Sequence, residues 1–264
     1  MFAGFWAIYK RELKAFAQSS STYIVLGLLF LIVGLFYHQI MVQFVNDSAM
    51  AQAGGPFGSP TEAPNVTVFV VQDLFRLISA MILFTIPVLT MRLIAAERSR
   101  GTFEVLVTCP VGDWSIILGK YFALVTVGVA LVVLSSVYPL TIYLFGRSQG
   151  AVPELPIVIS CYLGLILIFS TYAAFGLMAS SFTESQATAA VVTLIGLLLW
   201  NSIGEFSIPD QRIQRIVSQL SAANHTEPFL TGLLTGRDIA FFVLTSFAFL
   251  FAAARVLEAR RWRI

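Results

Sequence analysis

Long apolar segments alternate with short polar ones along the whole chain. Six apolar segments cover residues 22–45, 70–91, 115–145, 156–181, 186–204 and 238–257. Each comes close to the 20 or so apolar residues that a helix needs to cross the hydrocarbon core of a bilayer. Residues 24–33 show no alternation of apolar and polar positions, which the strands of a membrane barrel would require. The pattern therefore predicts an all-α membrane protein built as a six-helix transmembrane bundle.

The composition excludes several function classes. Of the 264 residues, 58% are hydrophobic and 11% are charged, whereas about 25% are charged in a typical soluble domain. So few charges do not cover the surface of a soluble enzyme of this size. The net charge of +2 and the lack of a basic stripe argue against nucleic acid as a partner. The two cysteines, Cys109 and Cys161, have no metal-ligand spacing, and we expect neither a disulfide nor a metal site from them.

The distribution of Lys and Arg predicts the orientation of the bundle. Eleven of the 16 basic residues fall on one side of the predicted spans: Lys10, Arg11, Lys14, Arg92, Arg98, Arg100, Lys120, Arg255, Arg260, Arg261 and Arg263. Basic loops face the cytosol, so both termini are expected there. A cleavable signal peptide is the alternative for the N-terminus. The first apolar run is over 20 residues, however, and exceeds the 7–15 residues of a signal h-region.

Two segments outside the spans have distinctive patterns. Residues 3–17 mix bulky apolar groups with Lys10, Arg11 and Lys14, which predicts an N-terminal interfacial helix with its cationic side toward lipid headgroups. Residues 205–237 hold apolar stretches too short to cross, which predicts an external re-entrant region. Residues 224–227 between these stretches are expected to form a turn. A metal site is disfavoured because only His225 and Glu227 lie close together. The loop at 46–68 suggests no chemistry.

The predicted spans carry no Asp, Glu, Lys or Arg near their centres. Such groups mark ion and proton pathways, and an intramembrane protease would need a catalytic pair or an HExxH motif that the chain lacks. Small residues in the fourth span, including Gly176 and Ser180, predict close helix packing instead. If this chain takes part in transport, its energy must come from outside the bilayer.

The most informative motif lies between the second and third spans. It reads Glu97-Arg98-Ser99-Arg100-Gly101-Thr102-Phe103-Glu104-Val105-Leu106-Val107-Thr108-Cys109-Pro110-Val111. The pattern predicts a helix over 96–110 that ends at Pro110. Glycine inside a helix costs about 1 kcal/mol, so Gly101 is expected to permit close approach by another surface. On these residues alone, an ordinary charged hairpin loop is an equally good interpretation.

This motif, with Ile117, Gly119 and Lys120 after it, resembles the signature of ABC-2 type permeases. Within that group the chain is most similar to the GldF-like and NosY-like branch, and the resemblance covers nearly its whole length (1–264, a single transmembrane domain). The resemblance implies a bacterial inner membrane protein that works as a dimer, with a second identical or paralogous copy. Each copy would dock on a cytosolic ABC ATPase subunit through the loop, which then serves as a cytosolic coupling helix.

Carried over onto this sequence, the family's docking contact would involve Glu97, Arg98, Gly101, Thr102, Glu104 and Leu106. The chain has no GxxxxGK[ST] sequence, so we expect no enzyme activity and no cofactor in it; ATP and Mg would bind to the partner subunit. The resemblance favours an exporter. The alternative is a mechanotransmitting scaffold that relays ATPase motion to an external accessory protein and moves no cargo. No residue identifies the cargo.

Overall fold

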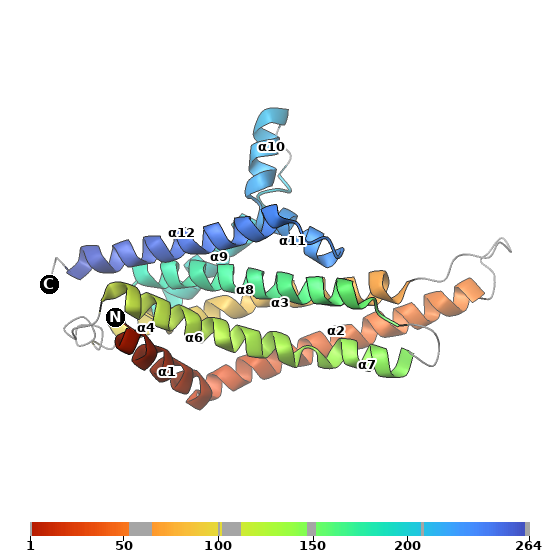
Figure 1. Cartoon of the computed structure of the whole chain (residues 1–264), viewed down its shortest axis with the longest axis horizontal. Coiled ribbons are helices and arrows are strands. Elements are labelled where there is room, and N and C mark those ends of the chain that lie inside the picture. Colours follow the sequence, from red (N-terminus) through yellow and green to blue (C-terminus); the bar gives the residue numbers. More distant parts are fainter. Residues whose placement is uncertain are drawn as a thin grey trace.

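The computed structural model describes residues 2–52, 65–99, 101, 112–146, 152–206 and 209–261. The described elements are all helical (Figure 1). In chain order they are α1 (Phe2–Gln18), α2 (Ser20–Gln52), the π-helical turn η1 (Thr67–Val71), α3 (Gln72–Thr90), α4 (Ala95–Ser99), α6 (Asp113–Leu134), α7 (Val137–Gly146), α8 (Leu155–Phe182), α9 (Gln186–Ser202), α10 (Gln211–Leu220), α11 (Ala222–Leu230) and α12 (Gly236–Arg261).

Within these ranges, five stretches are long and apolar enough to cross a membrane, where the sequence predicts six. They are Ser20–Ala51, Thr67–Arg98, Asp113–Gly146, Leu155–Phe182 and Gly236–Ala259. The predicted span at 186–204 becomes α9, which has 17 residues and lies at the lower limit for a spanning helix. It ends early because the chain turns at residues 203–205, where the Glu205 N–H donates to the Ser202 carbonyl.

Two of the predicted spans also contain local irregularities in their helices. The segment predicted at 115–145 is interrupted at Ser135 and Ser136, which separate α6 from α7. The Ser135 hydroxyl donates to the Val132 carbonyl at 2.7 Å, so it competes with the backbone ladder at this point. In α3, Pro87 lies inside the helix and the next turn closes through Met91 N–H to the Pro87 carbonyl.

The core forms around α8, which contacts α3, α6, α9, α11 and α12. Small residues bring these helices close together, as the sequence predicted: Ala173, Ala174 and Ser180 are fully buried. A Cβ at Gly176 would lie 2.5 Å from the Thr90 Oγ1, so only glycine lets α8 approach α3 there.

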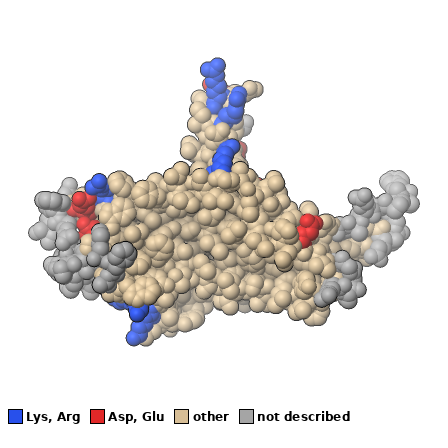
Figure 2. Space-filling model, viewed as in Figure 1, with Lys and Arg blue, Asp and Glu red and all other residues tan. Residues whose placement is uncertain are grey.

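Two helices depart from the direction of the bundle in Figure 1. α1 meets α2 at a sharp angle, and α10 stands away from the side of the bundle. No residue of α10 is buried, and Lys and Arg side chains gather on this projection, whereas most of the bundle face in Figure 2 is uncharged. The first described residues and the carboxyl end of α12 lie at the same end as α4.

Candidate functional site

The segment predicted to contact an ATPase begins in α4, at one end of the bundle. Of its six predicted contact residues, Glu97, Arg98 and Gly101 are described, whereas Thr102, Glu104 and Leu106 lie outside the described residues. Glu97 and Arg98 both bond to other helices. These two side chains therefore connect the predicted docking segment to the rest of the bundle.

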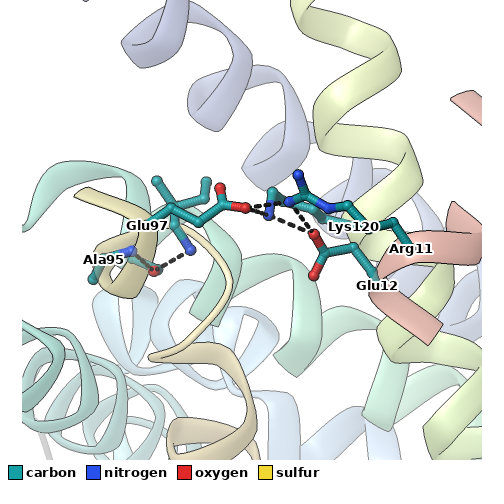
Figure 3. A network of polar contacts seen from close by, with 7 residues as sticks. Arg11, Glu12, Ala95, Glu97 and Lys120 are labelled. Atoms are coloured by element: carbon teal, nitrogen blue, oxygen red, sulfur yellow. Dashed lines mark hydrogen bonds and ion pairs between the residues drawn. The ribbon is translucent and has the colours of Figure 1, made fainter. Parts of the chain in front are cut away.

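Glu97 belongs to a charge cluster made by Arg11, Glu12, Glu97 and Lys120, which come from three helices (Figure 3). The Lys120 Nζ lies 2.9 Å from the Glu12 Oε1 and 2.9 Å from the Glu97 Oε1. The Arg11 guanidinium lies 2.8 Å from the same Glu12 oxygen and also pairs with Glu97. Two cations thus face two carboxylates between α1, α4 and α6.

Lys120 is only 1% exposed, so its charge depends on these partners. An isolated buried ammonium would be strongly unfavourable, and ion pairs with hydrogen bonds are what compensate it. Burial by itself raises the pKa of Glu12, but the charge and hydrogen bonds of Lys120 and Arg11 outweigh burial and lower that pKa. Glu12 is therefore held as the carboxylate that Lys120 requires.

The local sequence brings α1 close enough for these pairs to form. A Cβ at Gly119 would lie 2.9 Å from the Cγ2 of Ile8, so glycine at this position lets α1 pack directly on α6. In the same interface, the hydroxyls of Tyr9 and Thr126 are hydrogen-bonded at 3.0 Å. α1 is thus docked on α6 by packing and by polar contacts.

A second set of bonds fastens α4 to the end of α8. The Arg98 Nη1 donates to the carbonyls of Ser181 and Thr183, each at 3.0 Å. These are carbonyls at the end of α8, where a cation is favourable. The Ser180 Oγ accepts from the N–H groups of Ile94 at 3.3 Å and Ala95 at 3.0 Å. Through these bonds and the ion pair of Glu97 with Lys120, α4 is attached to both α8 and α6.

Gly101 ends α4. Its φ is +69°, and no described side chain or backbone atom lies within 4 Å of a Cβ built there. Its N–H donates to the Arg98 carbonyl at 3.0 Å, and α4 ends at Ser99. The prediction of an uninterrupted helix through Gly101 is therefore wrong. The left-handed conformation that ends α4 favours glycine at this position.

A second polar site lies away from α4, where α11 meets α12. The His225 Nδ1 lies 2.6 Å from the Asp238 Oδ1, and its Nε2 donates to the Gln219 carbonyl at 2.9 Å. The imidazole stacks on Phe241 with ring centroids 3.9 Å apart, and both polar residues are buried. Nearby, Arg76 of α3 pairs with Glu227 at 3.2 Å.

These contacts correct the prediction of a turn at 224–227. All four residues lie inside α11, and the chain bends at Ser221 instead. His225 and Glu227 have separate partners, and the described part of the chain holds no group of three or more His, Cys, Asp or Glu residues arranged for a metal ion.

Residues 6–239 match the sequence family described as ABC-2 family transporter protein. The chain belongs to this family. No curated protein matches it. As an ABC-2 transporter protein with several apolar helices, it is a multi-pass membrane protein and a permease component of an ABC transporter. Family membership also implies association with an ATP-binding subunit and with a membrane-spanning partner.

Sequence reasoning missed the role of Lys120 in this permease. It was counted among the basic loop residues, but it is buried and bonded to Glu12, 108 residues earlier. The one available signal was its position directly after Gly119, at the start of an apolar span.

Proposed function

We propose that this ABC-2 permease is the transmembrane subunit of an exporter driven by ATP hydrolysis in a separate cytosolic subunit. The observation that carries the proposal is the double attachment of α4. Glu97 bonds to Lys120 of α6, and Arg98 bonds to the end of α8. A segment fastened in this way passes an external push to several spans, as a coupling element must.

In this mechanism the ATPase docks on the segment that follows α4. Glu97 and Arg98 anchor the segment, while Thr102, Glu104 and Leu106 contact the ATPase. ATP closes the ATPase subunits, and the closed form binds the segment more tightly than the open form. Only such a difference in affinity shifts the permease between its conformations, since equal affinity would shift nothing. The charge cluster then moves α1 and α6 together with α4.

The partners follow from the same scheme. ATP and Mg bind in the ATPase, and this chain is not itself an enzyme. A second permease copy, identical or paralogous, completes the pathway. α9 supplies a sixth membrane span. The protein lies in the bacterial inner membrane with both termini in the cytosol, consistent with α1 and the end of α12 lying at the end that carries α4. The proposal retains the resemblance to the GldF-like and NosY-like branch.

Affinity purification of the tagged chain from native membranes tests the proposal. A co-purifying ATPase and ATP hydrolysis are expected for the wild type, and both are lost in Glu104→Arg because reversing the charge repels the docking surface. Arg255→Gln is the matched control, since Arg255 bonds only within α12, to Glu258. An ATPase that co-purifies equally with Glu104→Arg would contradict the docking site, and no ATPase with any variant would contradict the proposal.

A pair of substitutions at Gly101 sharpens the test. Asparagine tolerates a positive φ, whereas a β-branched residue there costs about 1–2 kcal/mol. Gly101→Asn should therefore keep ATPase binding, while Gly101→Val should weaken it without loss of membrane insertion. Equal binding by both variants would mean that the turn at Gly101 does not orient the docking segment.

A scaffold that relays motion without moving cargo is the second candidate. The projection of α10, which has no buried residue, favours it because this helix offers a surface to an external protein. Inverted membrane vesicles containing the permease and its ATPase distinguish the two candidates. ATP-dependent accumulation of a compound from the native cells supports export. ATP hydrolysis without accumulation, together with an external protein that binds through α10, supports the scaffold.

A further inference from the structure

A cavity of about 530 Å³ opens beside the charge cluster, among α1, the beginning of α2, the turn that follows α3, α4 and the start of α9. Its volume lies within the range of about 300–1,000 Å³ usual for small-molecule sites. Its polar lining includes Arg11, Arg92, Ser19, Ser21, Thr22 and Gln186. Glu12 and Glu97 of the charge cluster also line it, and of these residues Glu97 alone belongs to the proposed ATPase contact.

The cations around this cavity outnumber the carboxylates. Both carboxylates, Glu12 and Glu97, are already bonded by Lys120 and Arg11. Arg92 has no carboxylate within ion-pair distance among the described residues, and its Nη1 donates to the Ser19 Oγ at 2.6 Å. Three cations thus face two carboxylates, and one positive charge remains for a ligand to neutralise.

Three residues with hydroxyl groups line the cavity together with Arg92. The Ser19 and Ser21 hydroxyls are hydrogen-bonded to each other at 2.9 Å. Thr22 also lines the cavity, and its hydroxyl has no hydrogen-bond partner within the described ranges. A guanidinium beside several hydroxyls is a donor set suited to the oxygens of a phosphate group.

The surroundings point to a phosphate carried by a lipid. Directly after the polar residues, α2 exposes Tyr23, Ile24 and Leu28. In the most apolar 18-residue stretch of this helix, only 11% of the residues are buried. A headgroup seated in the cavity would therefore place its acyl chains along an open apolar helix face.

We propose that this cavity binds the phosphate of an anionic phospholipid headgroup, with Arg92 as the principal cation and the hydroxyls of Ser19, Ser21 and Thr22 as hydrogen-bonding partners. Apart from Glu97, the lining of the site lies outside the proposed ATPase contact. The site lies between α1, α2 and the turn that follows α3, at the end of the bundle that carries α4.

Native mass spectrometry of the full chain, purified in detergent and titrated with phosphatidylglycerol, tests this site. One saturable lipid adduct per chain is expected. Arg92→Gln should weaken that adduct about tenfold or more, because a hydrogen bond to a charged group is lost together with the charge. Arg92→Lys should bind with intermediate affinity, and the control Arg255→Gln should bind like the wild type.

Further measurements separate the possible outcomes. Thr22→Val, which removes a hydroxyl at nearly constant volume, should also weaken the adduct, and it carries the test if Arg92→Gln does not fold. Phosphatidylcholine, which has no net charge, should bind more weakly than phosphatidylglycerol; equal binding would overturn the proposal. Inorganic phosphate that binds as tightly as the lipid would overturn the lipid assignment and leave a free phosphate site. Unchanged lipid binding by Arg92→Gln and Thr22→Val would overturn both the lipid site and the free phosphate site.

Discussion

Two short helices dock on the bundle through buried polar contacts, and the contacts are of different kinds. α1 docks on α6 through the charge cluster, in which Lys120 is paired with Glu12 and Glu97. α11 makes its buried polar contact with α12 through the pair of His225 and Asp238. In each case a residue in the first half of a long helix bonds to a shorter helix.

The two contacts differ in how their charges and hydrogen bonds are satisfied. The charge cluster is balanced by two cations and two carboxylates, so no further proton is required. In the other contact, both ring nitrogens of His225 face acceptors: Nε2 faces the Gln219 carbonyl, and Nδ1 faces Asp238. A carbonyl can only accept, so Nε2 donates to Gln219. The cluster is held by balanced charges, and the pair is held by hydrogen bonds at both ring nitrogens of one histidine.

The largest expected effect is at Lys120. Lys120→Met leaves two carboxylates facing each other with only the half-exposed Arg11 between them, and the loss of one partner from a buried ion pair costs about 3–5 kcal/mol. Denaturant unfolding of the detergent-solubilised chain measures this loss. The triple variant Lys120→Met, Glu12→Gln, Glu97→Gln should recover most of the stability. If Lys120→Met were as stable as the wild type, the charge cluster would not contribute to the stability of the fold.

A smaller effect is expected at Asp238. Asp238→Leu leaves the Nδ1 of a buried histidine without a partner, which costs about 1–3 kcal/mol. Asp238→Asn should lose less, because its amide can donate to the unprotonated Nδ1 of a neutral imidazole. Glu227→Gln is the matched control in the same region: its exposed pair with Arg76 contributes no more than about 1 kcal/mol. If Asp238→Asn were as damaging as Asp238→Leu, the carboxylate charge would matter more than the hydrogen bond.

The smallest expected effect is a loss of stability at acidic pH. Because the pKa of Glu12 is lowered from its ordinary 4.5, Glu12 stabilises the folded chain above that pH, and this contribution is lost as the pH falls through its lowered pKa. The wild type should therefore lose stability below about pH 4.5 more steeply than Glu12→Gln. Thermal unfolding midpoints of both proteins across this range provide the measurement, and parallel curves would contradict it.

The hydrophobic pattern was sufficient to predict the helical bundle, because long apolar runs specify membrane helices almost by themselves. The pattern also indicated the closely packed face of α8, where small residues such as Ser180 are buried. It could not identify the charge cluster. Glu12 and Lys120 are 108 residues apart and meet only when α1 folds onto α6. Charge counts assign Lys120 to a loop, since burial depends on tertiary packing.

Local patterns misled at two positions for physical reasons. Asn224 to Glu227 resemble a turn because they are polar and precede Pro228, but tertiary bonds from His225 stabilise the helix there. The segment around Gly101 resembles one continuous helix, but the positive φ of Gly101 interrupts it. In both cases the deciding contact or conformation is absent from the local pattern.

The length of α9 has a consequence for the membrane itself. Its 17 residues rise about 26 Å in total, whereas the hydrocarbon core of a bilayer is about 30 Å thick. As a span, α9 would force the bilayer to thin beside it, at a cost of a fraction of a kcal/mol for each ångström of mismatch. α2, with 33 residues, has no such constraint. The two sides of the protein would then deform the lipid unequally, and thinner membranes would accommodate the α9 side best.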